Sequence, residues 1–108
     1  MAAKINIVID QGTTFNTSFL IQNDLGDPID FSSYSANSQM RKSYASSTSY
    51  VFNVSLGSNG NIGLSMSANT TNNIVAGRYV YDVEVQDLNG VRSRIVEGIV
   101  TVTPQVTR

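Results

Sequence analysis

The stretch GRYVYDVEVQDLNGVRSRIVEGIVTVT, residues 77–103, predicts two long β-strands joined by a tight turn. In its first half, apolar Tyr79, Tyr81 and Val83 alternate with polar residues, which is the period of a half-buried strand. The tetrapeptide at 87–90, DLNG, supplies residues that tolerate the positive φ of a hairpin turn. The second half is rich in β-branched residues, which favour strands. This hairpin predicts an all-β protein.

The same alternation recurs along the rest of the chain. It predicts strands at 5–9, 15–21, 36–42, 50–56 and 62–66, with a short edge piece at 29–31. Turn-forming residues at 11–12, 23–28 and 57–60 and a serine-rich loop at 43–49 separate these strands. The sequence predicts one antiparallel immunoglobulin-like β-sandwich of seven to eight strands, spanning residues 1–108 as a single domain. Its expected core includes Phe15, Phe19, Phe52, Leu64, Tyr81 and Val83.

Residues 68–75 lack strand alternation and predict one short helical turn. Ser67 would cap its N-terminus, and Ile74 would be buried beneath it. The last strand contains a change of phase, because Ile95 and Val91 differ in parity from Val100 and Val102. A β-bulge at Gly98 would reconcile the two registers, since glycine is common at such sites.

The segment 76–81 resembles the entry to the penultimate strand of an immunoglobulin-type sandwich. In that arrangement the Tyr79 hydroxyl would bond to an upstream backbone group and form a tyrosine corner. Tyr81 would take the inward position that a cysteine holds in antibody domains.

Composition excludes several kinds of chemistry. The chain has 108 residues with no cysteine and no histidine, so disulfides, thiolate metal sites and imidazole catalysis are absent. Eight acidic and seven basic residues leave it nearly neutral, without the basic surface that nucleic acid or an anionic membrane requires. No apolar run approaches a membrane span, and the N-terminus has no signal-peptide pattern. We therefore expect a soluble, unexported protein that binds neither nucleic acid nor membrane.

Three groups of side chains are candidates for functional sites. Asp82 and Glu84 share one strand face at a spacing that a glycosidase could use, but a solvated hairpin face without a pocket is the favoured interpretation. Aspartates in the turn around Pro28 could hold Ca²⁺, but turn formation explains them better; these are Asp24, Asp27 and Asp30. Four basic residues are expected on solvated faces or paired across the hairpin with Asp82 and Glu84: Arg41, Lys42, Arg92 and Arg94. No catalytic, cofactor-binding or metal-binding residue is predicted, and the chain is expected not to be an enzyme.

The order of several motifs resembles small β-sandwich proteins of tailed bacteriophages. These motifs are IDQGTTF at 9–15, NDLGDPIDF at 23–31, QMRK at 39–42 and GRYVYD at 77–82, with VEGIVTVTP at 96–104. Such proteins occur in tails, baseplates and other virion structures, and the last two motifs are most similar to short virion proteins of marine cyanobacterial myophages. The resemblance covers nearly the whole chain. It implies a structural or adaptor role in the virion and no catalytic or ligand-binding residue.

Two functions remain to be compared. The first is a virion structural or adaptor module in the tail, baseplate, neck or head decoration, acting by protein–protein contacts. The alternative is a carbohydrate- or receptor-binding module, in which tyrosines around the 43–49 loop would stack on a sugar ring: Tyr34, Tyr44 and Tyr50.

Because few charged residues or prolines protect the outer strands, we expect homo- or hetero-oligomeric contacts with other virion proteins through residues 4–10 or 96–103.

Overall fold

A computed structural model describes residues 3–22, 25–27 and 29–106. Along the chain it contains β1 (Ala3–Lys4), β2 (Ile7–Asp10), β3 (Phe15–Leu20), β4 (Ser35–Arg41), β5 (Ser49–Leu56), β6 (Asn61–Met66), α1 (Ala68–Asn72), β7 (Gly77–Gln86) and β8 (Arg92–Thr103). The five main strands predicted before the hairpin are therefore confirmed, although the first is interrupted at Ile5–Asn6. The predicted edge piece at 29–31 is wrong, because these residues form no strand.

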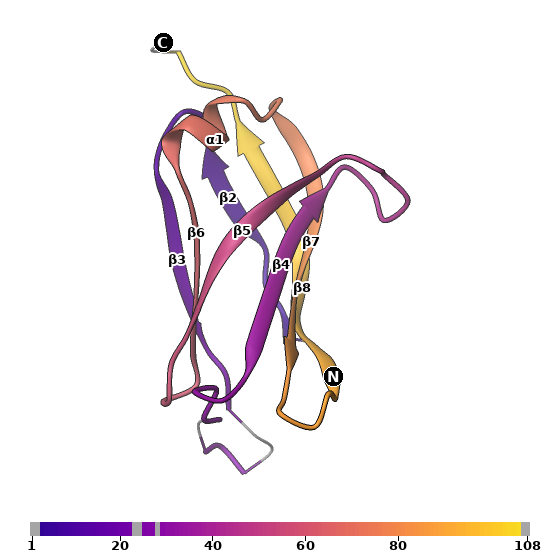
Figure 1. The fold of residues 1–108 in the computed structure, drawn as a ribbon. Helices are drawn as coiled ribbons and strands as arrows, with labels where there is room; N and C mark the ends of the chain where they lie inside the picture. Colours follow the sequence, from indigo (N-terminus) through magenta and orange to yellow (C-terminus); the bar gives the residue numbers. More distant parts are fainter. Residues whose placement is uncertain (1–2, 23–24, 28, 107–108) are drawn as a thin grey trace.

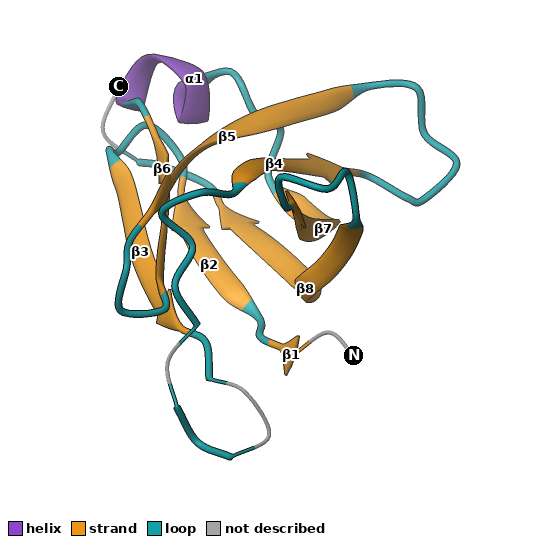
Figure 2. Ribbon diagram, turned by 60° about the horizontal axis from the view of Figure 1, so that its bottom comes forward, coloured by secondary structure: helices purple, strands orange, loops and turns teal. Residues whose placement is uncertain are grey.

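The strands form one curled sheet in the order β1-β8-β7-β4-β5-β6-β3, with β2 also paired to β8. β5 changes partner along its length: residues 49–52 pair with β4, and residues 53–56 pair with β6. We call β1, β2, β8, β7, β4 and residues 49–52 the first arm, and residues 53–56, β6 and β3 the second arm. Figures 1 and 2 show the sheet curling so that the two arms face each other.

The sheet is mixed, which corrects the prediction of a purely antiparallel fold. β1 and β2 both run parallel to β8, whereas the other pairings are antiparallel. The sequence pattern could not show this, because alternation reports which face of a strand is buried and not the direction of its neighbour. The all-β prediction is confirmed.

The core lies between the two arms. Buried side chains come from every strand except β1, and the predicted core residues Phe19, Phe52, Leu64, Tyr81 and Val83 are all among them. Phe15 is only partly buried, but its ring packs 5.9 Å from that of Phe52, measured between centroids.

The β-bulge lies at Ile95 and not at Gly98. Val83 pairs with Val96, while the next residue of β7, Glu84, pairs with Arg94, so Ile95 is the extra residue. Val96 is therefore inward with Val100 and Val102, while Val91 is exposed. The prediction failed because it placed Val91 and Ile95 in the core on hydrophobicity alone.

Gly98 instead marks a close approach of two backbones. A Cβ atom at this position would collide with the carbonyl oxygen of Ile5, in the short connection between β1 and β2. The Ile5 amide donates to the Glu97 carbonyl at 2.9 Å, and the Ile99 amide donates to the Asn6 side chain at 3.0 Å. Glycine thus allows the N-terminal segment to lie directly against β8.

The helical turn is confirmed in detail. The Ser67 hydroxyl accepts a bond from the Thr70 amide as the N-cap of α1, and Ile74 is completely buried. The Thr71 hydroxyl donates to the Thr13 carbonyl at 2.7 Å, and the Gln11 side chain donates to the Ile74 carbonyl at 2.7 Å. These bonds fix α1 to the connection between β2 and β3.

Two tyrosine hydroxyls anchor β7. Tyr79 donates to the Val75 carbonyl at 2.5 Å, so the predicted bond to an upstream backbone group is confirmed. Tyr81 donates to the Ile5 carbonyl at 2.6 Å and connects the middle of β7 to the N-terminal segment. Sequence reasoning missed the second bond, because the two residues are far apart in the chain.

The Tyr79 bond leads to a first prediction. Tyr79→Phe should lower the free energy of unfolding by about 1–3 kcal/mol, because it removes the bond that the hydroxyl of the buried Tyr79 side chain makes to the Val75 carbonyl. Urea denaturation would measure the change. Tyr44→Phe is the matched control, since Tyr44 is 74% exposed and should show a change within about 0.5 kcal/mol. Equal stability of both variants and the unmodified protein would mean that the Tyr79 hydroxyl is solvated.

Candidate functional site

A concentration of polar side chains lies on the outer face of the first arm. Strand alternation buries Tyr79, Tyr81 and Val83 of β7 and turns Asp82 and Glu84 outward. The outward residues of the adjacent strands lie beside them, since Gln39 of β4 and Glu97 of β8 both pair with Asp82. The face that sequence analysis assigned to Asp82 and Glu84 is therefore confirmed.

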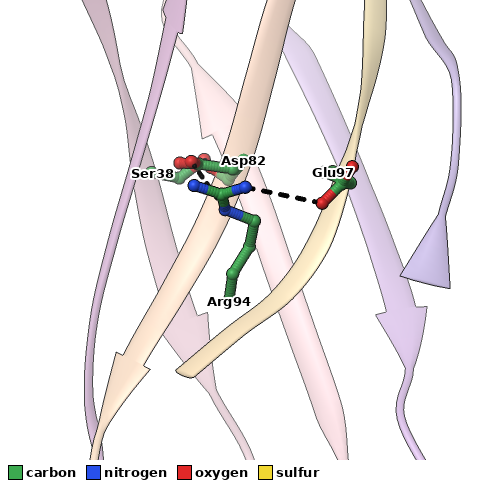
Figure 3. A network of polar contacts seen from close by, with 4 residues as sticks. All are labelled: Ser38, Asp82, Arg94 and Glu97. Carbon is green, nitrogen blue, oxygen red and sulfur yellow. Dashed lines mark hydrogen bonds and ion pairs between the residues drawn. The ribbon is translucent and has the colours of Figure 1, made fainter. Parts of the chain in front are cut away.

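An ion-pair network crosses this face (Figure 3). The Arg94 Nε atom lies 3.2 Å from Asp82 Oδ2, and Arg94 Nη1 lies 3.6 Å from Glu97 Oε2. The Ser38 hydroxyl donates to the Asp82 backbone carbonyl at 2.7 Å. The predicted pairing of Arg94 with Asp82 is confirmed, and Glu97 is a further partner that the sequence pattern did not indicate.

The bulge at Ile95 determines which charges meet. Arg94 is directly opposite Glu84, and Asp82 is directly opposite Glu97, so the guanidinium reaches Asp82 diagonally. Burial raises the pKa of Asp82, and the neighbouring Glu84 and Glu97 add to this, while Arg94 and Arg41 oppose it. Arg94 therefore compensates for a crowding of three carboxylates on two adjacent strands.

A shallow depression of about 300 Å³ lies over this network. Sequence analysis predicted an open face here without a pocket, so the depression is a correction. Side chains that donate and side chains that accept hydrogen bonds lie next to each other in this depression, an arrangement that suits hydrogen bonding to a polar partner surface. It is lined by Gln39, Arg41, Tyr44, Val80, Tyr81, Asp82, Glu84 and Arg94.

The four basic residues make separate local contacts instead of one patch. Arg41 donates to the Ser46 carbonyl at 2.7 Å and to the Gln39 side chain at 2.9 Å, which holds the 43–48 loop against β4. Lys42 lies 4.9 Å from the centroid of the Tyr79 ring, in a cation–π contact. Arg92 donates to the Gln86 side chain at 3.2 Å, across the hairpin. Of the pairing expected with Asp82 and Glu84, the Arg94–Asp82 ion pair is therefore confirmed, while Arg41, Lys42 and Arg92 make these other contacts.

The aspartates of the turn around Pro28 are the candidate calcium ligands. Asp30 accepts a bond from the Ser32 amide at 2.9 Å, and its hydrogen bonds with Ser32 lower the pKa of its carboxyl group. This is the turn chemistry that the sequence favoured. Asp24 lies outside the described residues, and within the described part of the chain no three acidic side chains form a metal-binding group.

The three tyrosines proposed as a sugar platform make different contacts. The Tyr34 ring packs at 5.2 Å on Phe31, and the Tyr50 ring packs at 6.1 Å on Tyr79, both edge to face. Both side chains are partly buried against the core, whereas Tyr44 is exposed beside the depression. Of the three, Tyr44 is the ring that is exposed to solvent.

Burial of the tyrosines in β7 predicts sensitivity to alkali. Burial raises the pKa of Tyr81 to about 12 from an ordinary value of 10.0, and burial also raises the pKa of Tyr79. The unfolded chain therefore ionises first, so this stabilisation is complete below about pH 10 and is lost as the pH rises toward 12.

Urea midpoints measured between about pH 8 and pH 11.5 should fall with pH, and Tyr81→Phe should flatten that fall. An identical pH dependence in the variant and the unmodified protein would contradict the buried phenol.

The described residues contain no helix of the length and hydrophobicity needed to cross a membrane. No protein-family model and no curated protein sequence matches this chain.

Solved structures show likeness at the level of the fold. A crystal structure of a mutant SrpA adhesin from Streptococcus sanguinis aligns with a TM-score of 0.53 and 11% sequence identity, over 92% of this chain and 55% of that chain. A family 123 glycoside hydrolase from Clostridium perfringens aligns with a TM-score of 0.44 and 14% identity, over 97% of this chain and 24% of that chain. This chain thus spans about half of the adhesin chain and a quarter of the hydrolase chain. The likeness to the adhesin supports a sandwich-like all-β fold, and the likeness to the hydrolase is too weak to support an inference.

Proposed function

We propose that this chain is a structural or adaptor module of a tailed-phage virion, acting by protein–protein contacts in the tail, baseplate, neck or head decoration. The observation that carries the proposal is the resemblance, in order and spacing, of the motifs at 9–15, 23–31, 39–42, 77–82 and 96–104 to virion β-sandwich proteins. The proposed location is the virion, after synthesis in the host cytoplasm. The chain acts without catalytic residues or a cofactor in this proposal.

The proposal includes an immunoglobulin-like arrangement of the strands. The order β4-β7-β8 corresponds to strands C, F and G of that fold, and β3-β6 with residues 53–56 corresponds to B, E and D. The hydroxyl bond of Tyr79 supports the same assignment, because the tyrosine corner belongs near the start of strand F. In this comparison β1 and β2 take the place of strand A and pair with strand G.

The proposed contacts with other virion proteins use residues 4–10. β2 pairs with β8 along one side, and the Ile5 and Gln11 amides both donate toward β8. Because successive residues of a strand direct their backbone groups to opposite sides, those of Val8 point away from β8. The Val8 side chain is 61% exposed. Residues 96–103, the other segment expected from the sequence, offer no free edge, because β7 covers one side and the segment from β1 to β2 covers the other. A partner strand added beside β2 would extend the first arm.

Mass spectrometry of purified particles tests the proposed role. The chain should be present in mature virions at a constant ratio to the major tail or capsid proteins through successive purification steps. Its ratio should not fall as host proteins are removed. Loss of the chain in parallel with the host contaminants would overturn the proposal.

A carbohydrate- or receptor-binding module is the second candidate. The observation that favours it is Tyr44, which stands exposed beside a depression lined by Gln39, Asp82 and Arg94. An aromatic ring next to such polar groups is a common way to hold a sugar. A glycan array should then show binding that Tyr44→Ala removes and Tyr34→Phe retains. Absence of binding at high protein concentration would remove this candidate.

A further inference from the structure

β3 presents an open backbone edge at the end of the second arm. Within the described residues it pairs with β6 alone. The Ile21 amide donates to the Gly60 carbonyl at 2.8 Å, so the odd-numbered residues of this strand direct their backbone groups toward β6. The backbone groups of Asn16, Ser18 and Leu20 therefore point away from the sheet. Figure 1 shows β3 along one side of the molecule.

The β3 edge lacks the features by which β-proteins usually prevent pairing. Phe15–Leu20 contains no charged residue and no proline, and its register with β6 is regular along all six pairs. The uncharged run of the sequence extends from residue 11 to residue 23. A groove of about 440 Å³ beside the strand is lined by residues of both β2 and β3, among them Val8 and Asn16.

The edge formed by β1 and β2 differs from the β3 edge. It is interrupted at Asn6, whose side chain accepts a bond from the Ile99 amide. At its other end the Asp10 carbonyl already accepts bonds from the Thr13 amide and hydroxyl. A strand paired there would meet the outward backbone groups of Val8 and then the charged Asp10. β3 is thus the longer and more uniform edge.

We propose that β3 pairs antiparallel with β3 of a second copy of this chain, about a two-fold axis at Ser18. Ser18 then lies opposite itself, and Asn16 lies opposite Leu20 of the second copy. The three residues that point their backbone groups outward become the hydrogen-bonded positions of the new ladder. An isologous contact must be complementary to itself, and a strand without charge meets that condition because no like charges face each other. The Leu20 side chain, 57% accessible, would be partly covered by Asn16 of the second copy on each side of the axis.

This inference does not depend on the proposed virion role, because it concerns the isolated chain. The contact is one strand long, so we expect dimers at about 0.1–1 mM protein, as is usual for small interfaces. Sedimentation velocity over a concentration series would measure the dissociation constant. A protein that stays monomeric throughout this range would overturn the proposal.

Matched charge variants test the position of the axis. Ser18→Lys should weaken dimerisation about fivefold or more, because two like charges then face each other. Ser55→Lys is the control, since Ser55 is an exposed serine on β5 of the same arm and lies two strands from the edge. It should leave the dissociation constant unchanged. Circular dichroism would verify that both variants are folded.

Mixing opposite charges provides the decisive comparison. Ser18→Glu alone should also weaken dimerisation, and an equimolar mixture of Ser18→Lys with Ser18→Glu should restore it as a heterodimer. Restoration supports pairing about Ser18. A dimer that is indifferent to Ser18→Lys, equally weakened by Ser55→Lys, or not restored by mixing would contradict the proposed contact.

Discussion

Phe52→Ala should lower the free energy of unfolding by about 3–5 kcal/mol, the usual cost of removing a buried aromatic ring. Phe52 is 2% exposed and lies at the point where β5 passes from the first arm to the second. Its ring is 5.9 Å from Phe15 and 6.1 Å from Tyr81, so it connects side chains of both arms. Truncation would leave a cavity between the arms that their hydrogen-bonded strands cannot fill.

Urea denaturation with an unchanged m-value would measure this effect. Val51→Ala is the matched control, because Val51 precedes Phe52 on the same strand and is 61% exposed. Its change should be less than about 1 kcal/mol. A similarly small loss for Phe52→Ala would show that the ring does not bridge the arms.

Gly98→Ala should lower the free energy of unfolding by about 1–3 kcal/mol, because it forces a Cβ atom against the backbone carbonyl of Ile5. The Ile5 carbonyl that it displaces is also the acceptor of the Tyr81 hydroxyl. The substitution therefore breaks a side-chain bond on β7 while it pushes the N-terminal segment away from β8. Amide exchange of residues 5–10 should accelerate more than that of β7.

Gly57→Ala provides the control for this glycine. A Cβ atom at Gly57 would lie 3.4 Å from the nearest atom, the Cβ of Asn61, which requires only a small adjustment. Its stability should stay within about 1 kcal/mol of the unmodified protein. If Gly98→Ala were as well tolerated, the close packing of the N-terminal segment against β8 would be wrong.

The strands and the buried faces could be predicted because they depend on local pattern. Alternation in the segments around Leu64 and Tyr81 placed their side chains in the core, and the Ser67 cap and the Tyr79 bond each join residues within four positions. The parallel pairing of β2 with β8 could not be predicted in this way, since it joins the two ends of the chain. The bulge was misplaced because a partly buried Ile95 has the hydrophobicity of a core residue.

The candidate site was predicted only in part for the same reason. Alternation indicated that Asp82 and Glu84 share the outer face, and hairpin pairing indicated Arg94 as a partner. The participation of Glu97 depends on the bulge, and the neighbouring Gln39 depends on the pairing of β4 with β7. These contacts follow from tertiary register, which a single sequence does not show.

Hydrogen exchange of residues 4–10, compared between the isolated protein and the assembled particle, tests the proposed role as a virion module most directly. In the isolated chain at low concentration, the Val8 amide should exchange quickly, because it faces away from β8. Residues 96–103 serve as an internal reference, since they are paired on both sides within one chain. We predict that residues 4–10 become more protected in the particle while the reference changes little. Equal protection of residues 4–10 in the two states would contradict a virion contact at this edge.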